Sequence, residues 1–143
     1  MEDEIADFRK LESIKDTFNN RRVISMLEWQ TFCQKPLKKL IAEIIGTERV
    51  CGIYKITNVL SKECYIGQSV DVGDRWKEHV KCGCGVDTPA GNKLYKAMKD
   101  CGIWNFSFEL LEEVPPELLN EKEKYYISIY DSYNYGYNST AGN

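Results

Sequence analysis

Two short strand-like runs joined by a polar turn, within residues 51–67, constrain this chain more than any other stretch. The first run contains Gly52-Ile53-Tyr54 and the second contains Tyr65-Ile66-Gly67. Side chains in the first run alternate in polarity, which is typical of a strand. Asn58 and Ser61-Lys62 supply turn chemistry, so the runs are predicted to form a hairpin. This pairing can bring both tyrosines to one face, although two core aromatics would give the same pattern.

The hairpin leads directly into a predicted helix over residues 70–81. Ser69 is its expected N-cap, and two aspartates fall near its first turn, where acidic side chains suit the helix dipole. Arg75 and His79 are four residues apart, so they share one face of this helix. A tyrosine hairpin therefore runs straight into a helix that carries an arginine–histidine pair.

In these residues the sequence strongly resembles the GIY-YIG nuclease family, which includes certain homing endonucleases, some restriction enzymes and the excision-repair incision subunit. The hairpin and the following helix match the first three motif blocks of the family in identity, order and spacing. Glu123, two residues before Tyr125-Tyr126-Ile127, matches the metal-binding glutamate of the family. Gly136-Tyr137-Asn138 matches its closing block. The resemblance covers about residues 50–141.

The resemblance implies an endonuclease that hydrolyses DNA phosphodiester bonds with one divalent ion, Mg²⁺ or Mn²⁺, held by Glu123. Family members often carry a second histidine near the start of the helix predicted at residues 92–100. This chain has Pro89-Ala90-Gly91 there, and His79 is its only histidine, so a mechanism with two imidazoles is not expected. The residues expected to form the catalytic site are Tyr54, Tyr65, Arg75, His79, Glu123 and Asn138.

Phosphodiester cleavage explains why these residue types belong together. Mg²⁺ takes few carboxylates and keeps its waters, so one ion on Glu123 can stabilise the leaving oxygen and the charge on phosphorus. Arg75 offers a planar fork to the non-bridging oxygens. Tyrosine is a poor base at neutral pH. We therefore predict Tyr54 as base or water-positioner only with nearby cations and with His79 as its hydrogen-bond partner, while Tyr65 orients the phosphate.

The metal ligand has a neighbouring alternative in Glu121, which lies about 200° around the predicted helix from Glu123. Lysines gather on the outer face of the helix at residues 92–100, where a solvated face and phosphate contact are about equally expected. The lysines predicted to contact nucleic acid are Lys77, Lys93, Lys96 and Lys99.

The predicted fold class is α/β (α+β), with a small antiparallel sheet of three strands flanked by helices. Its strands are expected at residues 51–57, 63–67 and 104–111, and its helices near residues 70–81, 92–100 and 116–131.

Residues 1–49 are predicted to form a helical extension, separate from a nuclease domain at residues 50–143. Apolar residues recur every three or four positions from Ile5 to Phe18, and again from Leu37 to a stop at Gly46. No catalytic constellation is visible in this extension. We expect it to pack on the nuclease, to form a homodimer or to bind a protein partner.

Composition excludes some classes of protein. The chain has no apolar run of membrane-spanning length and no secretory signal, which suggests a cytoplasmic protein with free thiols among its six cysteines. A zinc site on His79, Cys82, Cys84 and Cys101 is the weaker alternative, because the spacing of Cys82 and Cys84 is too short for the usual knuckle. The net charge of −3 still permits a local basic face for DNA.

One alternative function stays open. The chain could be a nucleic-acid-binding or assembly module that keeps the fold without cleaving DNA. The presence of every expected catalytic residue type favours the enzyme.

Overall fold

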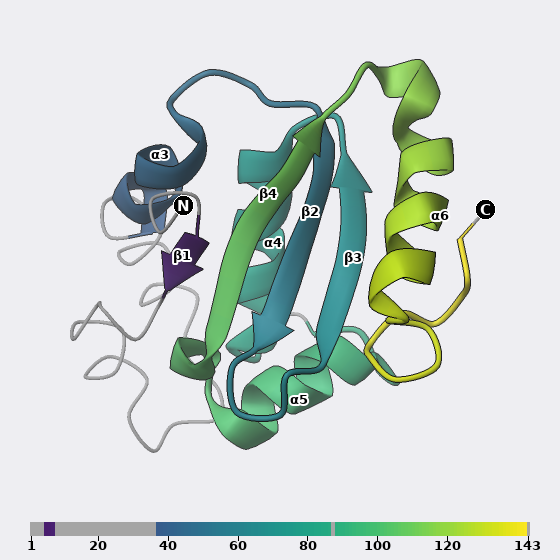
Figure 1. Ribbon diagram of the computed structural model, residues 1–143. Helices are drawn as coiled ribbons and strands as arrows, with labels where there is room; N and C mark the ends of the chain where they lie inside the picture. The colour runs from purple at the N-terminus through teal and green to yellow at the C-terminus, as the bar shows by residue number, and fades with distance from the viewer. Residues whose placement is uncertain (1–4, 8–36, 87, 143) are drawn as a thin grey trace.

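The computed structural model describes residues 5–7, 37–86 and 88–142. In these residues an antiparallel sheet in the order β1-β4-β2-β3 lies between helices on its two faces (Figure 1). Its strands are β1 (Ile5–Asp7), β2 (Gly52–Asn58), β3 (Cys64–Ser69) and β4 (Phe106–Glu113). The helices are α3 (Lys38–Ile45), α4 (Val72–Gly83), α5 (Lys93–Cys101) and α6 (Leu119–Tyr130), with short 3₁₀ turns η4 (Ile103–Asn105) and η5 (Pro116–Leu118).

The predicted hairpin is confirmed. Strands β2 and β3 pair antiparallel with Tyr54 opposite Gly67 and Ile56 opposite Tyr65. The turn between them is held by Asn58, whose Oδ1 accepts hydrogen bonds from the backbone N–H groups of residues 60 and 61. This short-range bonding by an asparagine side chain is a common way to close a tight turn. The predicted three-stranded core, β4-β2-β3, is therefore present.

Each face of the sheet has its own apolar cluster. Helices α3, α4 and α5 cover the face that carries Tyr54, Phe106 and Phe108, and these side chains are fully buried. Helix α6 covers the opposite face, where Ile53 and Ile66 contact its buried residues. Because side chains alternate along a strand, Tyr54 and Ile53 necessarily point to different clusters.

The structure corrects two local predictions. Ile5–Asp7, predicted as part of a helix, form a strand that pairs with β4. The spacing of apolar residues within this segment contains no information about β4, whose edge has unpaired backbone groups to which residues 5–7 bind. The N-cap of α4 is Asp71 rather than Ser69, since the Asp71 carboxylate accepts a hydrogen bond from the backbone N–H of Asp74. The predicted helical stretch at residues 8–36 lies outside the described residues.

The helix predicted before Gly46 is confirmed as α3, and it ends where Gly46 adopts a positive φ of 79°. Its apolar side packs into the main core, with Leu37, Leu40 and Ile41 buried. The longest described helices, α4 and α6, have 12 residues each, well short of the roughly 20 that cross a bilayer. No described helix is therefore a membrane span.

Candidate active site

Tyr54 lies at the centre of the predicted site and is completely buried. Its hydroxyl oxygen is 2.6 Å from Nε2 of His79 on α4. The Tyr54 ring can occupy this place only because Gly67, opposite it on β3, has no side chain: a Cβ at residue 67 would overlap the phenol ring. Burial raises the pKa of Tyr54 well above its ordinary value, and the nearby Tyr65 adds to this while the Arg75 guanidinium lowers it. The phenol is therefore neutral in this structure.

His79 is buried and uses both of its ring nitrogens. Its Nε2 contacts Tyr54, and its Nδ1 lies 2.9 Å from the hydroxyl of Tyr95 on α5. Burial, with the charge of Arg75, lowers the pKa of His79 to about 3. The imidazole is therefore neutral near pH 7, and one of its two nitrogens carries no proton. With both nitrogens engaged, His79 has none left for zinc.

Tyr65 and Arg75 lie between this buried pair and solvent. The Tyr65 ring centroid is 6.4 Å from that of Tyr54 and 5.5 Å from that of His79. Tyr65 is half-buried, whereas Arg75 is exposed. Burial raises the pKa of Tyr65 and Arg75 counteracts it, as it does for Tyr54. An exposed cation therefore stands beside both phenols, as the sequence predicted.

Glu123 faces the sheet because of its position on α6. Leu119 and Ile127, four residues before and after it, are buried, so all three share one stripe of the helix. Glu123 is half-buried; burial raises its pKa, and a hydrogen bond from Gln68 on β3 opposes this. Its charge also raises the pKa of Tyr65. The carboxylate therefore lies near Tyr65 and the edge strand β3.

The surroundings of Glu123 fit a divalent cation. Among the described residues no lysine or arginine forms a salt bridge with it. No group of three or more His, Cys, Asp or Glu side chains gathers in the described ranges, so an ion here would take most ligands from water and phosphate, as Mg²⁺ commonly does. Glu121 is exposed and lies off the inward stripe, which favours Glu123 as the ligand.

Asn138 acts on the backbone of β3 rather than on the phenols. Its Oδ1 accepts a hydrogen bond from the N–H of Ile66, and its Nδ2 donates one to the carbonyl of Ile66, both at 2.8 Å. One buried amide thus replaces a neighbouring strand at the residue that follows Tyr65. The predicted site residue Asn138 therefore holds the strand that carries Tyr65.

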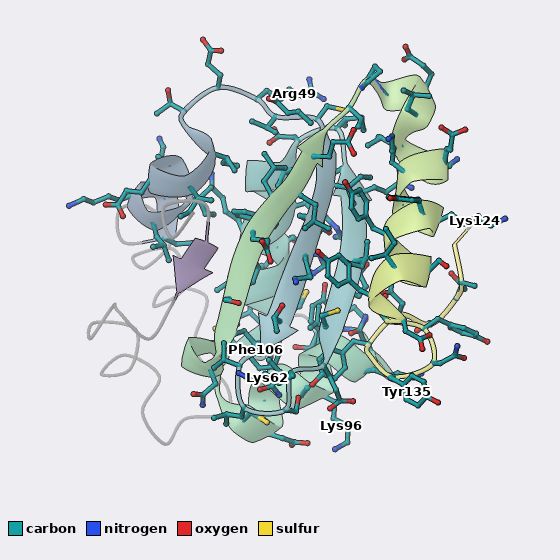
Figure 2. All side chains as sticks on the ribbon, viewed as in Figure 1. Arg49, Lys62, Lys96, Phe106, Lys124 and Tyr135 are labelled. Atoms are coloured by element: carbon teal, nitrogen blue, oxygen red, sulfur yellow. The ribbon has the colours of Figure 1, made fainter. Side chains whose placement is uncertain are left out.

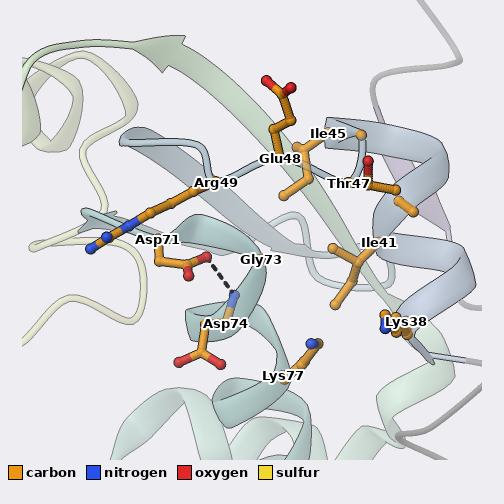
Figure 3. A pocket seen from close by; sticks show the side chains of 12 residues that line it. Lys38, Ile41, Ile45, Thr47, Glu48, Arg49, Asp71, Gly73, Asp74 and Lys77 are labelled. Atoms are coloured by element: carbon orange, nitrogen blue, oxygen red, sulfur yellow. Dashed lines mark hydrogen bonds between the residues drawn. The ribbon is translucent and has the colours of Figure 1, made fainter.

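The four predicted DNA-contacting lysines come from two helices, Lys77 from α4 and Lys93, Lys96 and the half-buried Lys99 from α5. Lys77 lines an open groove of about 280 Å³ between α3 and α4, with Lys38 and Asp74 nearby (Figure 3). Lys93 and Lys96 are exposed on α5, and Lys96 points outward at the end of the molecule (Figure 2). Its Nζ is already 2.7 Å from the Asp100 carboxylate. The groove contains none of the tyrosines of the site.

Sequence reasoning missed Tyr95. The residue was visible on the predicted lysine helix, but its contact with His79 arises only when α5 packs on α4. The available signal for the burial of Tyr95 was the helical period, which places it on the side of the helix away from Lys93 and Lys96. The five cysteines among the described residues form no disulfides.

The chain matches the GIY-YIG catalytic domain over residues 50–138, and it therefore belongs to the GIY-YIG family. A solved structure of the catalytic domain of the intron endonuclease I-TevI, in a glutamate-to-alanine variant, is similar, with a TM-score of 0.56 and 30% identity; the match covers 66% of this chain and 97% of that domain. A second structure, of the catalytic domain of the homing endonuclease I-TevI, has a TM-score of 0.55 and 33% identity, covering 63% and 98%. No curated protein sequence matches the chain.

Proposed function

We propose that this chain is a metal-dependent endonuclease that hydrolyses phosphodiester bonds in DNA. One observation carries the proposal: a buried Tyr54–His79 pair, 2.6 Å apart, lies beneath an exposed Arg75 and a half-buried Tyr65. Burying a phenol and an imidazole costs free energy through desolvation, and such buried titratable pairs are found more often at functional sites. Membership of the GIY-YIG family and likeness to endonuclease domains support the same reading.

Arg75 is suited to bind the phosphate that is cut. Its charge acts on both tyrosines, and its planar group can donate two parallel hydrogen bonds to non-bridging oxygens. Tyr65 keeps exposed surface and can donate a hydrogen bond to the same phosphate. We assign direct contact with DNA to these two residues.

Tyr54 and His79 are suited to move a proton. Tyr54 has no exposed surface, so its oxygen meets the attacking water only after DNA binding shifts the side chains that cover it. Nε2 of His79, 2.6 Å from the Tyr54 oxygen, would then accept the proton of Tyr54 as Tyr54 takes one from water. Burial and Arg75 lower the pKa of His79 to about 3, so this transfer needs the negative charge of the bound phosphate nearby. This division assigns Tyr54 as the base and His79 as its proton acceptor.

Glu123 would hold the divalent ion, Mg²⁺ or Mn²⁺. The bound ion would neutralise charge on the phosphate and stabilise the departing 3′ oxygen. The residue itself contributes a half-buried carboxylate with no basic partner in the described part of the chain, close to the side on which Tyr65 lies. Such a carboxylate binds a cation more favourably than a fully solvated one.

The competing function is a module that binds nucleic acid without cutting it. The complete burial of Tyr54 is the observation that favours it. DNA binding occurs under both functions, so only cleavage separates them. Conversion of supercoiled plasmid to nicked circles, measured with Mg²⁺ and with a chelator, is the decisive assay.

A matched pair of variants tests the metal ligand. Glu123→Gln keeps the size of the side chain and removes its charge, so we expect loss of Mg²⁺-dependent nicking by at least about 100-fold with folding retained. Glu121→Gln changes an exposed residue on the same helix and should cut at the wild-type rate. Activity retained in Glu123→Gln and lost in Glu121→Gln would transfer the metal site to residue 121, and an inactive wild-type chain would reject the nuclease.

A further inference from the structure

The contacts of His79 continue away from Tyr54 to the surface of α4. The Tyr95 hydroxyl, 2.9 Å from Nδ1 of His79, is also hydrogen-bonded to the thiol of Cys82. The Cys82 thiol in turn donates to a carboxylate oxygen of Glu78, with Sγ and Oε1 3.8 Å apart. Glu78 is exposed. A row of side chains therefore joins the buried tyrosine of the site to a surface carboxylate.

Glu78, at the end of this row, determines which partner donates in each hydrogen bond. An ionised carboxylate only accepts hydrogen bonds, so Cys82 must donate to Glu78. The sulfur of Cys82 then accepts from the Tyr95 hydroxyl, whose oxygen in turn accepts from Nδ1–H of His79. Nε2 of His79 is left unprotonated, and it accepts from Tyr54. Burial raises the pKa values of Cys82 and Tyr95, so both keep the protons that this arrangement requires.

We propose that Tyr95 is a positioning residue that, with Cys82 and Glu78, holds His79 in the tautomer protonated at Nδ1. The inference rests on the proposed nuclease function, in which Tyr54 takes a proton from water. In this tautomer the Tyr54 proton points at His79, so the Tyr54 oxygen faces the other way only as an acceptor, for the hydrogen bond from Arg75 and for that water. In the opposite tautomer His79 would donate to Tyr54, and the Tyr54 proton would point toward the water instead.

No other described part of the site orients His79 in this way. The second ring nitrogen of a catalytic imidazole commonly sets its tautomer through the partner it contacts. Here that partner is a phenol, which can donate or accept, and only the thiol and carboxylate beyond it decide between the two. Tyr95, Cys82 and Glu78 therefore act through His79.

Nuclear magnetic resonance can test this directly, because His79 is the only histidine in the chain. The two ring nitrogens of a neutral imidazole have well-separated ¹⁵N resonances, so histidine-labelled protein reports one tautomer without assignment. The wild-type spectrum should show His79 protonated at Nδ1. Tyr95→Phe, which keeps the ring and removes the hydroxyl, should shift the population toward Nε2, and Glu78→Ala should do so in the same direction.

Kinetics supply the second readout. Tyr95→Phe should lower kcat for plasmid nicking at least about tenfold with little change in KM, because it removes no DNA contact. Tyr126→Phe is the matched control: it also loses a hydroxyl hydrogen bond, at 2.8 Å to Glu112, away from His79. Its tautomer and kcat should equal those of the wild type. Thermal unfolding of each variant checks that the fold is kept.

Three results would overturn the inference: a wild-type His79 protonated at Nε2, an unchanged tautomer in Tyr95→Phe, or a changed tautomer with unchanged kcat. An unchanged tautomer in Glu78→Ala would remove Glu78 from its proposed place at the end of the row. Failure of the proposed function is separate and visible in the wild-type chain, which would then not nick DNA. In that case the ¹⁵N measurement alone decides whether Tyr95 positions His79.

Discussion

Gly67 lies directly opposite Tyr54 in the β2–β3 pair, and the Tyr54 ring fills the space that a side chain at residue 67 would occupy. The ring can cross the neighbouring strand only because that residue has no Cβ. Its hydroxyl then reaches Nε2 of His79 at 2.6 Å. The geometry of the buried pair thus depends on a glycine of the other strand.

Replacement of this glycine should displace the phenol. Gly67→Ala places a methyl group where the completely buried ring of Tyr54 lies, so the ring must move within the core. We expect a loss of about 1–3 kcal/mol in the free energy of unfolding and loss of plasmid nicking. Urea unfolding and the nicking assay measure the two effects.

Gly73→Ala provides the control for that experiment. A Cβ at residue 73 would meet the flexible side-chain ends of Ile45 and Ile41 at 3.3 and 3.5 Å, rather than a fixed ring. Residue 73 also lies within α4, where alanine is favoured over glycine by about 1 kcal/mol. Equal destabilisation by both replacements would show that the overlap with Tyr54 has no special role.

The burial of His79 predicts how stability depends on pH. Its pKa is lowered to about 3 in the folded protein, by burial first and then by Arg75, from an ordinary 6.5. Below pH 6.5 the unfolded chain therefore binds a proton that the folded protein does not, and the free energy of unfolding falls as pH is lowered toward 3. Above pH 7 this contribution is constant. The facing groups, Tyr54, Tyr65 and Tyr95, stay neutral throughout this range.

The measurement is the difference between two proteins, since carboxylates also titrate in acid. Urea unfolding from pH 7.5 to pH 4 should show a steeper decline for the wild type than for His79→Gln, which has no titrating ring. The difference should begin near pH 6.5 and reach several kcal/mol at most. Parallel curves for the two proteins would mean that His79 is not desolvated in solution.

The parts of the site that were predicted from sequence are those that depend on neighbouring residues. Tyr54 and Tyr65 were expected on one face because of strand alternation and a short turn, and Arg75 and His79 share a face because they are four apart. Glu123 was identified by its motif, and the burial of Leu119 on the same stripe gives the physical reason.

The parts that were missed depend on how separate elements pack. Tyr95 meets His79 only because α5 rests on α4, and no periodicity within either helix contains that information. The strand Ile5–Asp7 forms because β4 offers it a partner. The burial of Tyr54 agrees with the alternative that the tyrosines are core aromatics, and its completeness results from the combined cover of the helices on that face.

Asn138, predicted as a residue of the catalytic site, should contribute substantially to the stability of the fold. Asn138→Ala leaves the N–H and the carbonyl of Ile66 without their partners in a buried place, at a cost of about 1–3 kcal/mol for each group. Asn134→Ala, whose side chain makes one exposed hydrogen bond to Asp131, should cost much less. Thermal unfolding of both variants makes the comparison, and equal shifts in Tm would contradict the role in supporting β3.

The last prediction concerns the segment before the nuclease motifs. Deletion of residues 1–46 would remove Leu37 and the helix α3, of which Leu40 and Ile41 are part; all three side chains are buried in the same cluster as Tyr54 and Trp76. Burial of side chains of this size contributes about 1.5–3 kcal/mol each. We therefore expect a chain that starts at Thr47 to lose several kcal/mol in its free energy of unfolding.

This expectation separates a packing role from targeting or dimerisation. Leu37→Ala in the full chain should lower the free energy of unfolding by about 2–5 kcal/mol, whereas Lys38→Ala, at an exposed neighbouring position, should leave it nearly unchanged. If the segment only tethered or dimerised the nuclease, both variants would be equally stable and the truncated chain would differ solely in solution mass or in nicking rate at low concentration. A truncated chain with wild-type stability would exclude α3 from the core. One that is soluble only with added denaturant would place the segment within the folding unit of the nuclease.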